Sequence, residues 1–379
     1  MRETMPIKLL VALCFIMFSS FCLSIGLMSP GVAKGPMRST PQIKDMSGRD
    51  IGVTVPAQRV AILAPVLSAY AAIDEGLGHV NSVARVIQKA ESRGVFGHIF
   101  PQLASLPIAG LIGTIPDPEL TLLLRPDALV AWRGQSETLR KIGYPGLVEL
   151  ENSSLQNLVD VWAFLGKLAG HQTESTRLWQ SAETRQRDLQ KALPLNEKTA
   201  KVLPMGQMAG GWFIGGKNYY LNVLLEQVNA VNPAGDLLFY GATNPEEILR
   251  LDPDFIVMPA FTDEAAPKRL YDDPLWQALP SVRQRRVYLM PVNLIFNVPV
   301  DETLLLTWLA EVLHPSLPPM TRAAYREIYA QVYHYDLSDE EIDDALFLKE
   351  NAGSAGYDRF ARSQYGNSTD PDHAAPDRH

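Results

Sequence analysis

The segment "PEEILRLDPDFIVM", residues 245–258, joins the start of a helix to a buried strand. A very similar segment, "PELTLLLRPDALVA", occupies residues 118–131, which is 127 positions earlier. Each copy has Pro followed by Glu, an apolar pattern with helical spacing, a Pro-Asp pair and an apolar run typical of a strand. Two such units so far apart predict two similar halves within one chain.

Composition narrows the class of protein. With 379 residues, 46% of them apolar and 20% charged, the chain is long enough for two domains with separate cores. Its formal net charge is −8 and it has no basic block. This charge argues against a partner that is a nucleic acid or an anionic membrane surface.

The N-terminus has the order of a secretory signal peptide. Arg2 and Lys8 precede an apolar run over residues 9–28, and a small residue, Ala33, follows it. This order predicts a signal peptide over residues 1–33 and an exported mature protein. The alternative is an uncleaved membrane anchor, because the run approaches the length that spans a bilayer.

Cysteine usage agrees with export. Both cysteines, Cys14 and Cys22, lie inside the predicted signal, so the mature chain would have neither a disulfide nor a thiolate metal site. They follow Leu13 and Phe21, whereas a lipidation site needs a small residue there. We therefore expect a soluble exported protein.

The rest of the chain predicts an α/β fold of two Rossmann-like lobes with mostly parallel sheets. Strands alternate with helices over residues 34–152 and again over residues 196–318. Residues 153–195 predict a helical connector: a helix, a turn near Gly170, then a long helix with a polar surface. Ser153 or Ser154 would cap its start. This long helix would join the lobes rigidly.

Two further segments follow the second lobe. Residues 319–350 predict a helical extension of two amphipathic helices, in which Ser338 and Glu341 form a capping box. Residues 351–379 are rich in Gly, Ser, Asp and Pro, which predicts a disordered tail.

No motif nominates an active site. "GWFIGGKN", residues 211–218, matches a phosphate-binding loop only as far as Lys217, and its Trp-Phe-Ile interior indicates a strand followed by a turn. The seven histidines show no short metal-ligand spacing, and there is no G-x-S-x-G motif. We therefore expect no catalytic residues, no metal site and no cofactor, which favours binding over catalysis.

Two lobes joined by a long helix, each with the repeated helix–strand unit, resemble the substrate-binding proteins of ABC importers for iron–siderophore, heme and cobalamin. The resemblance covers roughly residues 48–316. It implies that Glu119 and Glu246 dock onto arginines of the permease dimer, one glutamate per lobe. The alternative is that both carboxylates only stabilise the positive ends of their helices.

The ligand of such a protein is expected between the lobes, at the carboxyl ends of the strands. "AWRGQ", residues 131–135, is similar to an Ala-Trp-Arg-Gly run in cobalamin-binding relatives, which also have an aromatic residue six positions before each docking glutamate. Tyr240 fits that position, whereas Gly113 occupies it in the first lobe and puts a corrinoid in doubt. The candidate ligand-binding residues are Trp132, Arg133, Trp212, Tyr219, Tyr220, Tyr240, Asn293 and Phe296.

The sequence thus predicts a monomeric periplasmic receptor that captures a metal chelate, hands it to an ABC importer and closes through a small hinge. A ferric siderophore is the first expectation, a corrinoid or heme the next, and a small oxyanion or bare metal ion follows. Two other classes stay open. One is an exported α/β enzyme, and the other is an interaction module anchored by residues 9–28.

Overall fold

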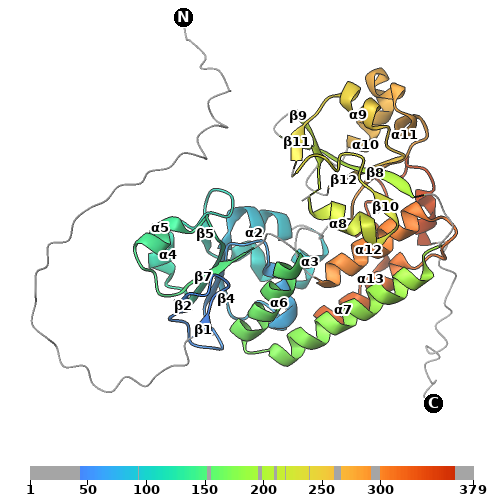
Figure 1. Cartoon of the computed structure of the whole chain (residues 1–379). Coiled ribbons are helices and arrows are strands. Elements are labelled where there is room, and N and C mark those ends of the chain that lie inside the picture. The colour runs from blue at the N-terminus through green and yellow to red at the C-terminus, as the bar shows by residue number, and fades with distance from the viewer. Residues whose placement is uncertain are drawn as a thin grey trace, which may run out of the picture. The chain divides into compact units, whose positions relative to one another are not determined.

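The computed structural model describes residues 43–92, 94–151, 155–194, 199–208, 211–217, 219–238, 240–259, 266–291 and 299–362 (Figure 1). The predicted signal peptide and the candidates Asn293 and Phe296 lie outside these ranges. No helix within them is long and apolar enough to span a membrane.

The first lobe is built on a parallel sheet. Its strands, among the described residues, run in the order β5-β4-β3-β6-β7. Most of their residues are buried, as expected for a sheet covered on both faces. The strands are β3 (Val60–Ile62), β4 (Val80–Ala84), β5 (Ile108–Gly110), β6 (Ala128–Trp132) and β7 (Leu147–Leu150). The helices are α1 (Leu67–Ile73), α2 (Arg85–Glu91), α3 (Val95–Ile99), η3 (Pro101–Ser105), α4 (Pro118–Leu124) and α5 (Glu137–Lys141). A short antiparallel pair, β1 (Ile43–Lys44) and β2 (Asp50–Ile51), precedes them.

The second lobe has a mixed sheet. Within the described residues its order is β11-β9-β8-β12-β13, and β10 also pairs with β8. β8, β10, β12 and β13 are parallel, while β9 pairs antiparallel with both β8 and the edge strand β11. The strands are β8 (Ala200–Met208), β9 (Gly211–Gly215), β10 (Ala230–Val231), β11 (Tyr240–Ala242), β12 (Phe255–Met258) and β13 (Val287–Leu289). The helices are α8 (Tyr220–Gln227), α9 (Pro245–Leu251), α10 (Ala266–Asp272), η4 (Pro274–Ala278), α11 (Pro280–Arg283) and α12 (Pro299–Leu313). Over its described residues, 211–217, the loop-like motif is therefore a strand that leads into a turn, as predicted.

The helical segment between the sheets forms as expected. α6 (Leu155–Ala169) and α7 (Gln172–Ala192) meet at Gly170, whose φ of +77° suits glycine. Ser175 and Trp162 fasten the two helices together, because the indole Nε1 of Trp162 donates to the carbonyl of Ser175 at 2.6 Å. A Cβ on Gly166 would lie 2.5 Å from the Cβ of Ser175, so only glycine permits this close approach.

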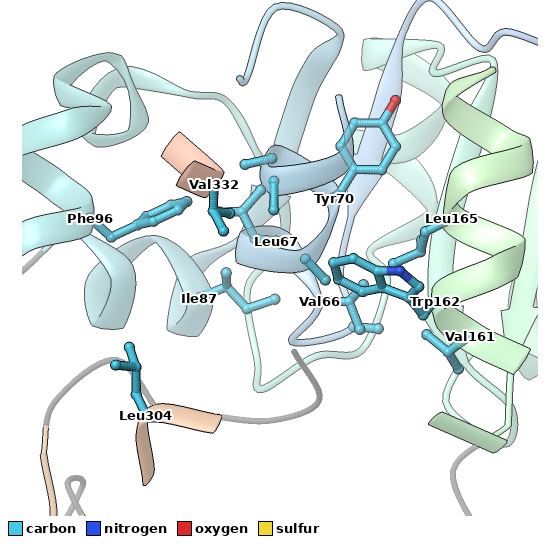
Figure 2. Close-up of a cluster of buried hydrophobic side chains, with 14 of the residues drawn as sticks. Val66, Leu67, Tyr70, Ile87, Phe96, Val161, Trp162, Leu165, Leu304 and Val332 are labelled. Atoms are coloured by element: carbon cyan, nitrogen blue, oxygen red, sulfur yellow. The ribbon is translucent and has the colours of Figure 1, made fainter. Parts of the chain in front are cut away.

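A continuous apolar core runs from the first sheet into the helices. Leu67 and Tyr70 of α1, Trp162 of α6 and Phe96 of α3 all belong to this cluster, and Figure 2 shows Leu67 between Phe96 on one side and Trp162 on the other. The same core includes Val332 of α13 (Thr321–Tyr333), which belongs to the segment after the second lobe. Residues far apart in the chain therefore share one buried cluster.

The C-terminal extension is ordered further than its composition indicates. α13 and α14 (Asp339–Ala345) form as predicted, and Ser338 with Glu341 makes the expected capping box. The prediction of disorder is wrong for residues 351–362, whereas residues 363–379 lie outside the described part. Asn351 is buried and binds the main chain of Leu289 at the end of β13. The amide of Leu289 donates to Oδ1 of Asn351 at 2.7 Å, and Nδ2 of Asn351 donates to the carbonyl of Leu289 at 2.9 Å.

The extension also contacts the first lobe. The Tyr333 ring at the end of α13 lies 5.9 Å from the Phe96 ring and 6.2 Å from the Phe100 ring, edge to face in both cases. The Nδ1 of His98 lies 3.2 Å from the Oε1 of Glu341 on α14. The segment that follows the second lobe is therefore packed against α3 of the first.

Candidate ligand-binding and docking sites

The repeated sequence units form matching structures. α4 and α9 each start with Pro at the first helical position, behind a side chain that caps the helix. Asp117 accepts a hydrogen bond from the amide of Leu120 at 3.0 Å, and Asn244 accepts one from the amide of Glu247 at 2.9 Å. Asp117 and Asn244 are themselves 127 positions apart.

The ends of the two helices match as well. Arg125 and Asp252 both adopt the left-handed conformation with φ of 47°, and a Pro-Asp pair follows each. Asp127 accepts from the amide of Gln58 at 3.2 Å, and Asp254 accepts from the amide of Lys201 at 2.9 Å. Each Asp thus fixes its helix–strand unit to the chain at the start of the neighbouring strand, β3 or β8.

Glu119 and Glu246 occupy equivalent places in these units. Each is the second residue of its helix, and each is exposed to solvent. The carboxylate of neither residue forms a hydrogen bond or an ion pair with a residue that the structure describes. Both carboxylates are therefore accessible to a partner and also lie where the helix dipole favours negative charge.

Exposed apolar side chains lie one helical turn after these glutamates, a feature that sequence reasoning missed. Leu122 and Leu123 follow Glu119 by three and four positions on α4, and both are exposed, Leu123 to 74%. Leu249, the equivalent of Leu122 in the second lobe, is also exposed. The available signal was the run Leu122–Leu124, because a helix of seven residues on a sheet cannot bury three consecutive leucines.

Trp132 and Arg133 lie at the carboxyl edge of the first sheet. Trp132 ends β6, which neighbours β3, and the order of the strands reverses between these two. Ligands of open α/β sheets bind at such a reversal. Trp132 is half-buried, and Arg133 is exposed and pairs with Glu151, the residue that follows β7. A ligand anion at Arg133 would share or replace that ion pair.

Tyr219 and Tyr240 are brought together in the second lobe by a residue that the sequence did not nominate. The buried Phe213 ring of β9 lies 6.5 Å from the Tyr219 ring and 6.1 Å from the Tyr240 ring. Burial raises the pKa of Tyr219 to about 12. Tyr240 is 62% exposed, so this group of three rings has one open side.

Trp212 is separated from the two tyrosines. Successive side chains of a strand point to opposite faces, so Trp212 and Phe213 project in opposite directions from β9. Trp212 packs edge to face against the buried Trp276, with the ring centroids 5.1 Å apart. It contributes to the core on that face and is not part of the ring group formed with Tyr219.

Some of the predictions concern parts that the structure does not describe. Asn293 and Phe296 are outside the described ranges, and so is the side chain of Tyr220. Across the described ranges, no group of three or more His, Cys, Asp or Glu side chains could hold a metal ion.

Comparison with known proteins gives a consistent result. A family of periplasmic binding proteins matches residues 67–294. An uncharacterized ABC transporter substrate-binding lipoprotein of Bacillus subtilis, YvrC, is 22% identical over 187 residues, which is 47% of this chain. The match spans 58% of the length of that relative.

Solved structures share the fold. A periplasmic solute binding protein from Veillonella parvula has a TM-score of 0.72 at 22% identity, over 82% of this chain and 98% of its own. The molybdate periplasmic binding protein MolA of Haemophilus influenzae has a TM-score of 0.67 at 15% identity, over 78% of this chain and 99% of its own. The predicted two-lobed α/β fold with a long helix is thereby confirmed. Since the family match covers more than half of the residues, the chain belongs to the periplasmic binding protein family, which binds solutes and is not enzymatic.

Proposed function

We propose that this protein is the extracytoplasmic receptor of an ABC importer and that its ligand is a metal chelate, first of all a ferric siderophore. The observation that carries the proposal is the pair of exposed glutamates, Glu119 and Glu246, on two helices that match in capping, length and termination. A permease of two subunits offers two equivalent surfaces, and one carboxylate per lobe suits such a partner.

The surroundings of the glutamates support a docking role. Exposed apolar side chains beside a charged group are typical of protein–protein contact surfaces. Leu122 and Leu249 provide such side chains at equivalent positions, so each lobe offers a carboxylate next to an apolar contact.

Charge reversal tests the docking. In vesicles that contain the cognate permease, Glu119→Arg or Glu246→Arg should reduce uptake at least about tenfold, because like charges at an interface cost several kcal/mol. The matched control is Glu137→Arg, since Glu137 is also an exposed carboxylate at the start of a first-lobe helix. Uptake by the Glu119→Arg and Glu246→Arg double variant at the level of the control would refute the docking role.

The ligand class rests on the aromatic residues. Phe213, Tyr219 and Tyr240 form a ring group with an open side, and Trp132 lies at the carboxyl edge of the first sheet. Flat apolar contacts of this kind suit a bulky chelate. Arg133 would add a charge-assisted hydrogen bond to an anionic chelate. In the first lobe, Gly113 stands where Tyr240 stands in the second, which favours a siderophore over a corrinoid.

A small oxyanion is the second candidate, because MolA, named as a molybdate binding protein, has the same fold. Native mass spectrometry of the protein taken from its own periplasm separates the candidates. A mass increment of several hundred daltons that contains iron supports the siderophore. An increment equal to a molybdate or a related oxyanion would refute it, as would heme or corrinoid absorption bands.

Export completes the proposal. We infer that residues 1–33 are removed and that the mature protein is soluble, because Leu13 and Phe21 precede the two cysteines where lipidation needs a small residue. The Bacillus subtilis relative is named a lipoprotein, so the point needs a direct test. N-terminal sequencing should find Lys34 first, and an intact Met1 on a membrane-bound form would refute the inference.

A further inference from the structure

The C-terminal extension closes a pocket at the amino ends of β12 and β13. This edge of the second sheet is opposite to the carboxyl edge at which the ligand of the proposed function is expected. The pocket has a volume of about 200 Å³. It is lined by Phe255, Arg286, Tyr288, Val312, Pro315, Ala355, Gly356, Tyr357, Arg359 and Phe360.

Aromatic rings form one wall of the pocket, in which Phe255 is half-buried and Tyr288, Tyr357 and Phe360 are almost fully buried. The ring of Tyr288 lies 6.2 Å from that of Phe255 and 6.0 Å from that of Tyr357. The angles between the ring planes are 30° and 34°. The Phe360 ring is 4.7 Å from the Tyr357 ring. The hydroxyl of Tyr288 donates to the carbonyl of Ala355 at 2.8 Å, so the extension holds this wall in place.

The pocket also carries an unpaired positive charge. The guanidinium carbon of Arg286 lies 5.1 Å from the centre of the Phe255 ring, and no acidic side chain among the described residues forms an ion pair with Arg286. Stacking uses the face of a guanidinium and leaves its in-plane N–H groups available as donors. The second arginine differs, because Arg359 is paired with the buried Glu311 at 3.2 Å.

We infer that this pocket is a second ligand site, distinct from the proposed chelate site, and that it takes a small aromatic monocarboxylate. The ring of the ligand would lie against the aromatic wall, and its carboxylate would accept hydrogen bonds from Arg286. A cavity of roughly 150 Å³ holds benzene and drug-sized pockets begin near about 300 Å³, so about 200 Å³ fits a single ring with one carboxylate.

Benzoate is the probe, and ligand-observed NMR of the full-length chain is the measurement. Benzoate should bind with a dissociation constant on the order of 1 mM, as expected for so few atoms. Benzamide, which keeps the ring but lacks the charge, and acetate, which keeps the charge but lacks the ring, should each bind at least about tenfold more weakly. Equal binding of benzoate and benzamide would overturn the role of the charge.

Variants locate the site. Arg286→Ala should weaken benzoate binding at least about tenfold, whereas Arg250→Ala, at an exposed arginine of the same lobe, should leave it unchanged. Ala355→Trp adds a large side chain to the lining and should abolish binding while the main-chain contacts of residue 355 remain. Trp132→Ala should not affect benzoate, so failure of the chelate proposal would leave this result standing. Undetectable benzoate binding, or unchanged binding by folded Arg286→Ala and Ala355→Trp variants, would overturn the inference.

Discussion

Glu91 makes the stability of the protein depend on pH in a direction opposite to most carboxylates. It ends α2 and is only 8% exposed. Its carboxyl group forms no hydrogen bond and no ion pair with any residue within the described ranges. Burial raises its pKa from 4.5 to about 7. A carboxyl group whose pKa is higher in the folded state holds its proton more tightly there. Stability should therefore fall as pH rises from 4.5 to 7.

The size of this effect follows from the shift. A difference of one pKa unit corresponds to about 1.4 kcal/mol, so the full effect of Glu91 is roughly 3 kcal/mol above pH 7. About 2–3 kcal/mol of it should develop between pH 5 and pH 8. Glu91→Met, which replaces the buried carboxyl by an apolar side chain of similar length, should be more stable than the parent at pH 8 and should lack this part of the pH dependence.

Urea denaturation followed by circular dichroism at pH 5, 6, 7 and 8 measures the effect. The control is Glu183→Met on the exposed side of α7, which should retain the pH dependence of the parent. If Glu91→Met is destabilised at pH 8, or if its pH dependence equals that of the parent, then the carboxyl is not held in an uncharged environment and the reasoning fails.

Three further predictions concern other regions. Asn351→Ala should lower the free energy of unfolding by about 1–3 kcal/mol, because both main-chain groups of Leu289 lose a buried partner, and an unchanged urea midpoint would contradict this. Trp132→Ala should weaken binding of the chelate found by mass spectrometry by about 1–3 kcal/mol in a fluorescence titration, and unchanged affinity would place the ligand elsewhere. For Glu341, burial opposes ionisation, but hydrogen bonds from Tyr335, Ser338 and His98 outweigh it and lower the pKa to about 2. The stability that Glu341 contributes is present above pH 4.5 and lost toward pH 2, so Glu341→Gln should flatten the acid side of a pH–stability profile.

The fold was predictable because its signals are local. The caps of α4 and α9, the Pro-Asp pairs and the apolar strands are all written in segments of fewer than twenty residues. The ordered structure of residues 351–362 was not predictable in this way, because the composition of this segment, rich in Gly and Ser, indicates disorder. Two aromatic residues in that segment, Tyr357 and Phe360, are fully buried and were the overlooked signal.

The candidate sites show a similar division. The exposed positions of Glu119 and Glu246 follow from the helix start that the sequence encodes. The separation of Trp212 from Tyr219 depends instead on which face of β9 carries each ring, and the antiparallel register with β8 sets that choice. A period of two residues places Trp212 and Phe213 on opposite faces of β9, but it cannot tell from sequence which of the two lies on the face of Tyr219 and Tyr240.

The contact of the extension with α3 affects the order in which parts of the protein can fold during synthesis. His98 and Glu341 are separated by 243 positions, and the Phe96 and Phe100 rings are covered by Tyr333. A growing chain would therefore finish the sheet of the first lobe long before the residues that cover α3 exist. Long-range contacts of this kind form late, because a large loop must close first. The first lobe should reach its final stability only after almost the whole chain has been made, and a fragment ending before α13 should leave two phenylalanine rings uncovered.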